Sequence, residues 1–163
     1  MQASFQMALS FLLAAADPLS PISYWGLGRS LAREGRYAES LQALKEFKAA
    51  NGFEPPVLTA EIGYSQAVSG DRLGALETEK QLENESRQRY VDPYFMAMVY
   101  LGLKESDRTY EWLDKAFDDR SSFLISITSD PRWAASRGDA RFQALWNRMT
   151  AKTSATSIPL NDQ

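Results

Sequence analysis

A pattern of small residues recurs at a nearly constant spacing along this chain, and it restricts the folds that the chain can adopt. Three copies can be aligned, each with a small residue, a turn residue and a second small residue: Gly28, Gly35 and Ser40; Gly63, Gly70 and Ala75; Ala97, Lys104 and Thr109. The second copy follows the first by 35 residues, and the less regular third copy follows by 34. A period in this range is typical of helical repeat arrays, in which each unit buries its apolar face against its neighbours.

The small residues predict where pairs of helices meet. Two helices approach closely where neither carries a bulky side chain. We therefore expect three facing pairs: Gly28 with Ser40, Gly63 with Ala75, and Ala97 with Thr109. Gly35 and Gly70 lie seven residues after the first small residue, where the first helix of each unit must end and the chain must reverse. Glycine adopts the left-handed conformation that ends a helix at the lowest cost.

Apolar periodicity and capping residues divide the chain into helical units. Ser20 and Pro21 are typical of a helix start, Asn51 and Gly52 of an end, and Asp92 and Pro93 of another start. We predict a single all-α domain over residues 1–150, followed by a flexible Ser/Thr-rich tail over 151–163. Its units are the second helix of a truncated repeat (1–18), repeat 1 (20–52), repeat 2 (55–88), repeat 3 (90–119) and a C-terminal cap (121–150).

These residues resemble the tetratricopeptide repeat (TPR). The positions that follow the TPR pattern are Gly28, Gly35, Tyr37, Ser40 and Leu44 in the first unit, Gly63, Gly70 and Ala75 in the second, and Ala116 in the third. The third unit departs from the pattern because Lys104 stands where a turn glycine is usual. The resemblance covers about residues 20 to 150. It implies antiparallel helix-turn-helix repeats that stack in a right-handed α-solenoid with a C-terminal capping helix.

A longer resemblance runs from Tyr90 to Met149, through YVDPYFMAMVYLGL, YEWLDKAF and DPRW. This part is similar to the C-terminal TPR region of bacterial multidomain transcriptional regulators, nucleotide cyclases and protein kinases. The resemblance implies that the chain is part of a larger bacterial regulatory protein, that this protein is cytoplasmic, and that it acts in signalling or transcription regulation.

Composition argues against catalysis and against nucleic acid as the main partner. The chain lacks Cys and His, which removes the thiolate nucleophile, the commonest general base and the commonest zinc ligand. Its net charge of -3 does not provide the basic surface that binds phosphates. The acidic residues Asp114, Asp118 and Asp119 are interpreted as solvated charge rather than a metal site. We expect no enzyme activity, no cofactor and no metal.

The N-terminal segment ASFQMALSFLLAAADP allows two readings. An apolar run followed by three alanines is found in signal peptides, but no Lys or Arg precedes this run. The run from Met7 to Ala16 is also too short to span a bilayer. We therefore favour a helix of a truncated repeat, with Phe5, Leu9 and Leu12 facing the array, and expect no association with a membrane.

The concave surface of a TPR array is lined by the first helix of each unit, and the resemblance places a partner-binding groove there. Its positions in this chain are Trp25, Arg29 and Arg33 in the first unit, Tyr64 in the second, and Tyr94 and Met98 in the third. Arg29 and Arg33 stand four residues apart and could together hold an acidic group. Trp25, Tyr94 and Met98 could equally be core residues, and the two arginines ordinary surface charge.

The leading hypothesis for function is a non-catalytic protein-protein interaction scaffold. It would be the partner-binding or sensory region of a larger bacterial regulator and would hold a peptide or a protein domain in its groove. The alternative is a self-association module without a separate ligand, with Phe5, Leu9 and Leu12 in the contact between copies.

Overall fold

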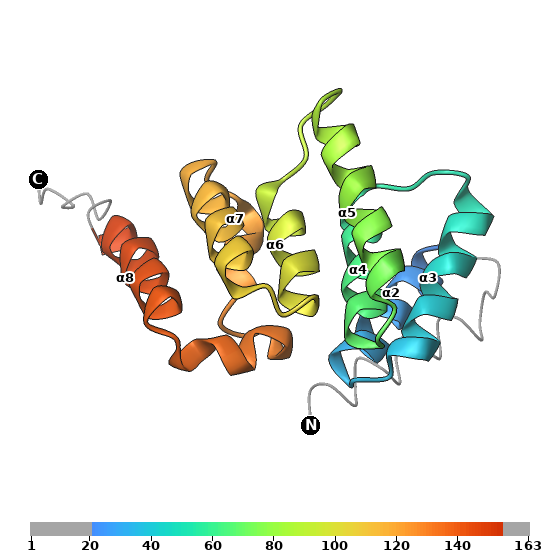
Figure 1. The fold of residues 1–163 in the computed structure, drawn as a ribbon, viewed down its shortest axis with the longest axis horizontal. Helices are drawn as coiled ribbons and strands as arrows, with labels where there is room; N and C mark the ends of the chain where they lie inside the picture. The colour runs from blue at the N-terminus through green and yellow to red at the C-terminus, as the bar shows by residue number, and fades with distance from the viewer. Residues whose placement is uncertain (1–20, 155–163) are drawn as a thin grey trace, which may run out of the picture.

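The computed structural model describes residues 21–154, and every regular element in this range is a helix (Figure 1). The elements in chain order are α2 (Pro21–Arg33), α3 (Tyr37–Asn51), α4 (Pro56–Val68), α5 (Arg72–Ser86), α6 (Pro93–Gly102), α7 (Ser106–Asp118), the 3-10 helices η1 (Ser122–Ser126) and η2 (Pro131–Gly138), and α8 (Ala140–Ser154). The prediction of an all-α protein is confirmed.

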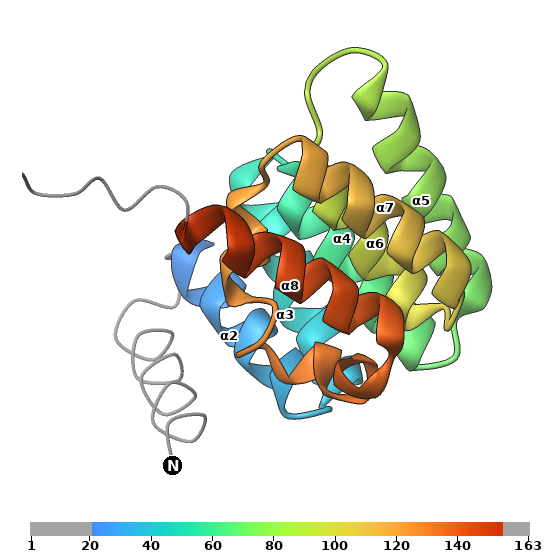
Figure 2. The ribbon, with the colours of Figure 1, turned by 90° about the vertical axis from the view of Figure 1, so that its left-hand side faces the viewer.

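The α-helices follow one another in packed pairs. Helices α2 and α3, α4 and α5, and α6 and α7 pack within their pairs, and α4 also packs on α6 and on α3. The chain therefore advances along the long axis of the molecule, from α2 and α3 at one end to α8 at the other (Figure 1). The view along this axis shows α8 lying across the end that α6 and α7 form (Figure 2).

Small residues lie where the helices of a pair approach each other. The Ser40 hydroxyl of α3 donates a hydrogen bond to the Gly28 carbonyl of α2 at 2.8 Å, so the predicted facing of these two residues is confirmed. A Cβ atom on Gly28 would come within 2.7 Å of the Leu44 side chain. At Gly63 the nearest atoms belong to Thr78 and to Val99 rather than to the predicted Ala75, so this glycine admits one side chain from its own pair and one from the next.

Four helices end in the same left-handed turn. Gly35 and Gly70 have φ angles of 78° and 94°, and the non-glycine residues Lys104 and Arg120 adopt φ angles of 60° and 58°. At each turn the next residue donates its N–H to a carbonyl five residues back, as Glu105 does to Tyr100 at 3.0 Å. This is the Schellman arrangement, which satisfies carbonyls at a helix end. The third predicted unit therefore keeps the turn although its glycine is missing.

Lys104 is a position where glycine should stabilise the protein. The left-handed conformation costs an L-residue roughly 1 kcal/mol or more, and glycine avoids this cost. We expect Lys104→Gly to raise the free energy of unfolding by about 1 kcal/mol in urea denaturation. Lys104→Ala is the matched control, because it removes the same side chain but retains the strained conformation. Equal stability of the two variants would contradict this explanation.

Helix α6 forms the centre of the main core. Every residue from Val91 to Tyr100 is buried, as expected for a helix that is apolar on all sides. Helices α4 and α7 pack against it, and Leu124, Trp133 and Phe142 belong to the same cluster. A second, smaller cluster around Leu44 joins α3 to α4.

The C-terminal region matches the predicted cap with two differences. Phe142 and Leu145 are buried while Arg141 and Arg148 are exposed, so α8 has the expected apolar and polar faces. However, α8 continues to Ser154, four residues into the predicted flexible tail. The cap also contains a second helix, η2, over residues 131–138, which the sequence analysis does not predict. Pro131 occupies the first turn of η2, where its missing N–H has no consequence.

No helix within residues 21–154 is long and apolar enough to cross a membrane. The predicted helix over 1–18, with Phe5, Leu9 and Leu12, lies outside the described residues, as does the part of the tail beyond residue 154.

Candidate functional site

The six predicted groove residues lie on three helices and differ in their exposure. Tyr64 on α4 and Tyr94 and Met98 on α6 are buried, with exposed fractions of 5%, 3% and 1%. The three residues of α2 are only partly buried and form a row along the helix, which we call the α2 stripe: Trp25, Arg29 and Arg33. The predicted surface is therefore half covered and half accessible.

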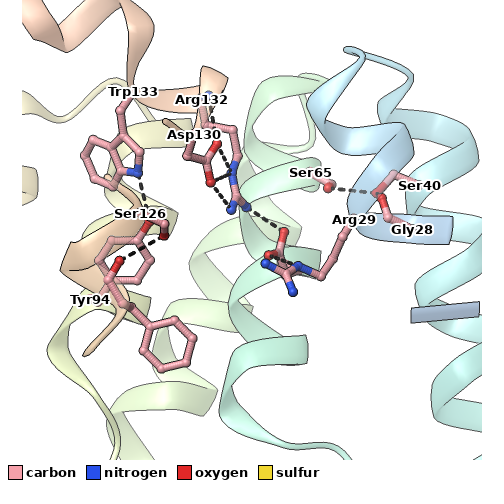
Figure 3. Close-up of polar contacts among 11 residues, drawn as sticks. Gly28, Arg29, Ser40, Ser65, Tyr94, Ser126, Asp130, Arg132 and Trp133 are labelled. Atoms are coloured by element: carbon pink, nitrogen blue, oxygen red, sulfur yellow. Dashed lines mark hydrogen bonds and ion pairs between the residues drawn. The ribbon is translucent and has the colours of Figure 1, made fainter. Parts of the chain in front are cut away.

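The covering element is the chain's own segment 121–138, which we call the cap segment. Its Phe123 ring stacks on Tyr94 with a centroid distance of 5.8 Å and meets Phe95 edge-on at 4.8 Å. Its Trp133 is fully buried and donates its indole N–H to the Tyr94 hydroxyl at 2.9 Å (Figure 3). Burial raises the pKa of Tyr94 to about 12. The aromatic half of the predicted groove is thus part of the protein's own core.

An ionic cluster fixes the cap segment to α4. The Arg132 guanidinium donates to Glu61 Oε2 at 2.6 Å and to Asp130 Oδ2 at 2.6 Å, and its Nε also contacts both Asp130 oxygens at 3.0 Å. The side chains of these three residues are at most 5% exposed. Arg132 also lies over the Tyr64 ring, with 5.5 Å between the guanidinium carbon and the ring centroid. These partners of Arg132 lie on α4 or at the position directly before η2.

Burial and charge act in opposite directions on this cluster. Desolvation disfavours the charged Arg132, but the Glu61 and Asp130 carboxylates outweigh it and raise the pKa of Arg132 above its usual value. Burial also opposes ionisation of Asp130, yet the hydrogen bonds and charge of Arg132, helped by the charge of Arg33, lower the pKa of Asp130. Both groups are therefore held in their charged forms at neutral pH.

The α2 stripe contacts the same ionic cluster through Arg29. Arg29 and Arg132 point toward each other (Figure 3), and Arg29 Nε lies 3.4 Å from Glu61 Oε1. Glu61 thus lies between two guanidinium groups, and the one from the cap segment is the closer. The acidic group expected beside Arg29 is, in this structure, a carboxylate of the chain itself.

Three N–H groups of the α2 stripe lack hydrogen-bond acceptors. Trp25 Nε1, Arg29 Nε and Arg33 Nε are buried from solvent, and none of them makes a hydrogen bond. The 3.4 Å approach of Arg29 Nε to Glu61 is an ion pair without hydrogen-bond geometry. The guanidinium of Arg29 also lies over the Trp25 ring, at 5.5 Å from its centroid, and Trp25 packs on Phe47 at 6.2 Å. A buried donor without a partner is costly, so this row can gain by receiving acceptors.

The sequence reading did not identify Glu61, Asp130 and Arg132 as members of the site. One signal was present: Glu61 is the single charged residue of α4, within an otherwise buried stretch from Leu58 to Ser65. A carboxylate on such a helix requires a buried cation. Nothing in the sequence indicated that the cation would come from a residue 71 positions further along the chain.

Two further polar features lie outside the α2 stripe. A cleft of about 380 Å³ lies beside Tyr64, Lys104 and Arg132, but Arg132 is paired as described above. The acidic residues Asp114 and Asp118 pair with Arg148 at 2.5 Å and 3.7 Å. Among residues 21–154, no group of three or more acidic side chains is arranged to hold a metal ion.

Comparison of the chain with protein-family models, with curated proteins and with solved structures finds no match. A function therefore has to be inferred from the residues of the chain itself.

The lowered pKa of Asp130 predicts loss of stability in acid. Its contribution is fully present above the ordinary carboxyl pKa of about 4 and is lost as the pH falls through the lower value of the folded state. We expect Asp130→Asn to be less stable than the parent protein at pH 7 and to lose less stability between about pH 5 and pH 2.

Urea denaturation over this pH range measures the difference. The control is Glu77→Gln, which neutralises an exposed carboxylate on α5. A parent protein and an Asp130→Asn variant with the same pH dependence would show that Asp130 does not contribute through its charge.

Proposed function

We propose that this chain is a non-catalytic protein-binding scaffold and that its α2 stripe binds an extended, acidic peptide segment of a partner protein. In the same proposal, the packed helix pairs are TPR-like repeats stacked in a right-handed solenoid, with α8 and the cap segment closing one end. Support for the repeat comes from the equivalent turns at Gly35, Gly70 and Lys104 and from the packing of α4 on α6.

The observation that carries the proposal is the row of unpartnered donors at Trp25, Arg29 and Arg33. These residues are four positions apart, so their Cα atoms are spaced by about 6 Å along the helix. The carbonyls on one edge of an extended chain recur every two residues, at about 6.6 Å. An extended peptide lying along α2 could therefore bring a carbonyl or carboxylate oxygen to each of these side chains, which would turn outward so that the buried donors reach the peptide.

The charge of the site favours an acidic segment. Three guanidinium groups, of Arg29, Arg33 and Arg132, surround two carboxylates, of Glu61 and Asp130, which leaves a net charge of +1. Complementary charge increases the association rate and discriminates against basic partners. Guanidinium groups also bind carboxylates with two parallel hydrogen bonds, which adds geometric specificity.

A place in a larger bacterial regulator, in the cytoplasm, follows from the resemblance of residues 90–149 and belongs to the same proposal. Partner binding by this scaffold requires neither catalysis nor direct contact with nucleic acid. Self-association would be the alternative if the surface that binds a peptide instead binds a second copy of the chain.

Neutralising the two arginines of the α2 stripe should weaken peptide binding. The experiment measures fluorescence anisotropy of two labelled nonapeptides, one with three glutamates at alternate positions and one with glutamines in their place. The parent protein should bind the glutamate peptide more tightly. The Arg29→Gln/Arg33→Gln variant should lose at least tenfold in affinity, because about 1.5 to 3 kcal/mol is lost with the charged hydrogen bonds.

The matched control is Lys45→Gln/Lys80→Gln, which removes the same charge from exposed positions on α3 and α5. Equal loss of affinity in the two double variants would show that only net charge matters and would contradict the proposed site. Light scattering on the same samples tests the alternative: a dimer that dissociates in Arg29→Gln/Arg33→Gln, without peptide binding, would favour self-association.

A further inference from the structure

We propose that Arg132 sets the charge preference of the α2 stripe, by binding Glu61 so that Arg29 remains available to a partner. This inference rests on the proposed function and names the residue that determines its specificity. Arg132 lies in the cap segment, outside the α2 stripe, and acts as a positioning residue.

Two distances show how Glu61 is shared between Arg132 and Arg29. Glu61 lies between two cations, with 2.6 Å from its Oε2 to Arg132 Nη1 and 3.4 Å from its Oε1 to Arg29 Nε. Only the shorter contact is a hydrogen bond. Arg132 therefore supplies the hydrogen bond to the Glu61 carboxylate. The side chain of Arg29, at 38% exposed, has donors left for another acceptor.

Burial strengthens the interaction between Arg132 and Glu61. The Arg132 and Glu61 side chains are 5% and 2% exposed, so solvent screens their charges weakly. If Arg132 were absent, Arg29 would be the nearest cation to Glu61, and the carboxylate would compete with any acidic partner for its guanidinium. The preference of the α2 stripe for acidic peptides thus depends on a residue that the peptide does not touch.

The ionisable groups facing this position define a charge series. Arg29, Arg33 and Arg132 face Glu61 and Asp130, with the hydroxyls of Tyr64 and Tyr94 nearby and neutral. The net charge is +1 in the parent protein, 0 in Arg132→Met, +2 in Glu61→Gln, and +1 again in the double variant Glu61→Gln/Arg132→Met. If Arg132 had only a structural role, the double variant would not recover the peptide preference of the parent protein.

The test measures, for each of the four proteins, the affinity for the glutamate nonapeptide divided by that for the glutamine nonapeptide. We expect this ratio to fall about fivefold in Arg132→Met, to rise about fivefold in Glu61→Gln, and to return to the parent value in the double variant. Raising the salt concentration should reduce the ratio in every protein that has a net positive site.

Folding of each variant is checked by circular dichroism, because Arg132→Met leaves Glu61 without its closest cation. If that variant does not fold, Arg132→Lys replaces it, since lysine keeps a cation beside Glu61 but lacks the forked donors of the guanidinium. A lower ratio in Arg132→Lys than in the parent protein supports the inference, and an equal ratio overturns it.

A second measurement is independent of any peptide. The Nε–H resonance of Arg29, followed by nitrogen-proton NMR, should show slower hydrogen exchange in Arg132→Met, because Glu61 then binds Arg29. Unchanged exchange in a folded variant would overturn the inference. Peptide binding with one ratio in all four proteins would also overturn it but leave the proposed function standing, whereas failure of the parent protein to bind either peptide would overturn both.

Discussion

The buried carboxylate of Glu61 is the constraint on which the arrangement of this chain depends. A charge in the interior must be paired and hydrogen-bonded, and α4 supplies no cation of its own. Arg132 meets this demand from the cap segment, 71 residues further along the chain. The pairing brings residues 121–138 onto α4 and α6, where Trp133 and Phe123 cover Tyr94. One polar requirement therefore determines which face of the helices is closed by the chain itself.

This pairing is better understood as a device for specificity than as a source of stability. The cost of removing two charges from water is about as large as their attraction, so a buried ion pair adds little net stability compared with apolar residues of similar size. Breaking one, however, leaves an unpaired charge that costs about 3 to 5 kcal/mol. Arg132 thus penalises any other position of the cap segment. The Trp133 to Tyr94 hydrogen bond adds a second polar condition in the same place.

Most of the fold could be predicted from local features of the sequence. The site could be predicted only in part, because it depends on long-range contacts. Capping residues, proline positions and the 35-residue period located the helix pairs and their turns, because these depend on neighbouring residues. The left-handed turn at Lys104 shows the limit of local reasoning: the packing of α6 and α7 imposes the turn on a residue that does not favour it. The cover of Tyr94 by Phe123 and Trp133 could not be predicted, because it depends on contacts between distant parts of the chain.

The two halves of the predicted groove differ in what they still require. On α4 and α6 the aromatic rings and the Glu61 carboxylate have partners within the chain, so a ligand there would have to displace a core that includes the fully buried Trp133. On α2 the three unpartnered donors have lost solvent without gaining acceptors. A ligand gains more by supplying missing hydrogen bonds than by replacing existing ones, because satisfied groups offer no net improvement. The proposed peptide would therefore gain more along α2 than on α4 and α6, and in the same proposal Arg132 acts from the closed half on the charge of the open one.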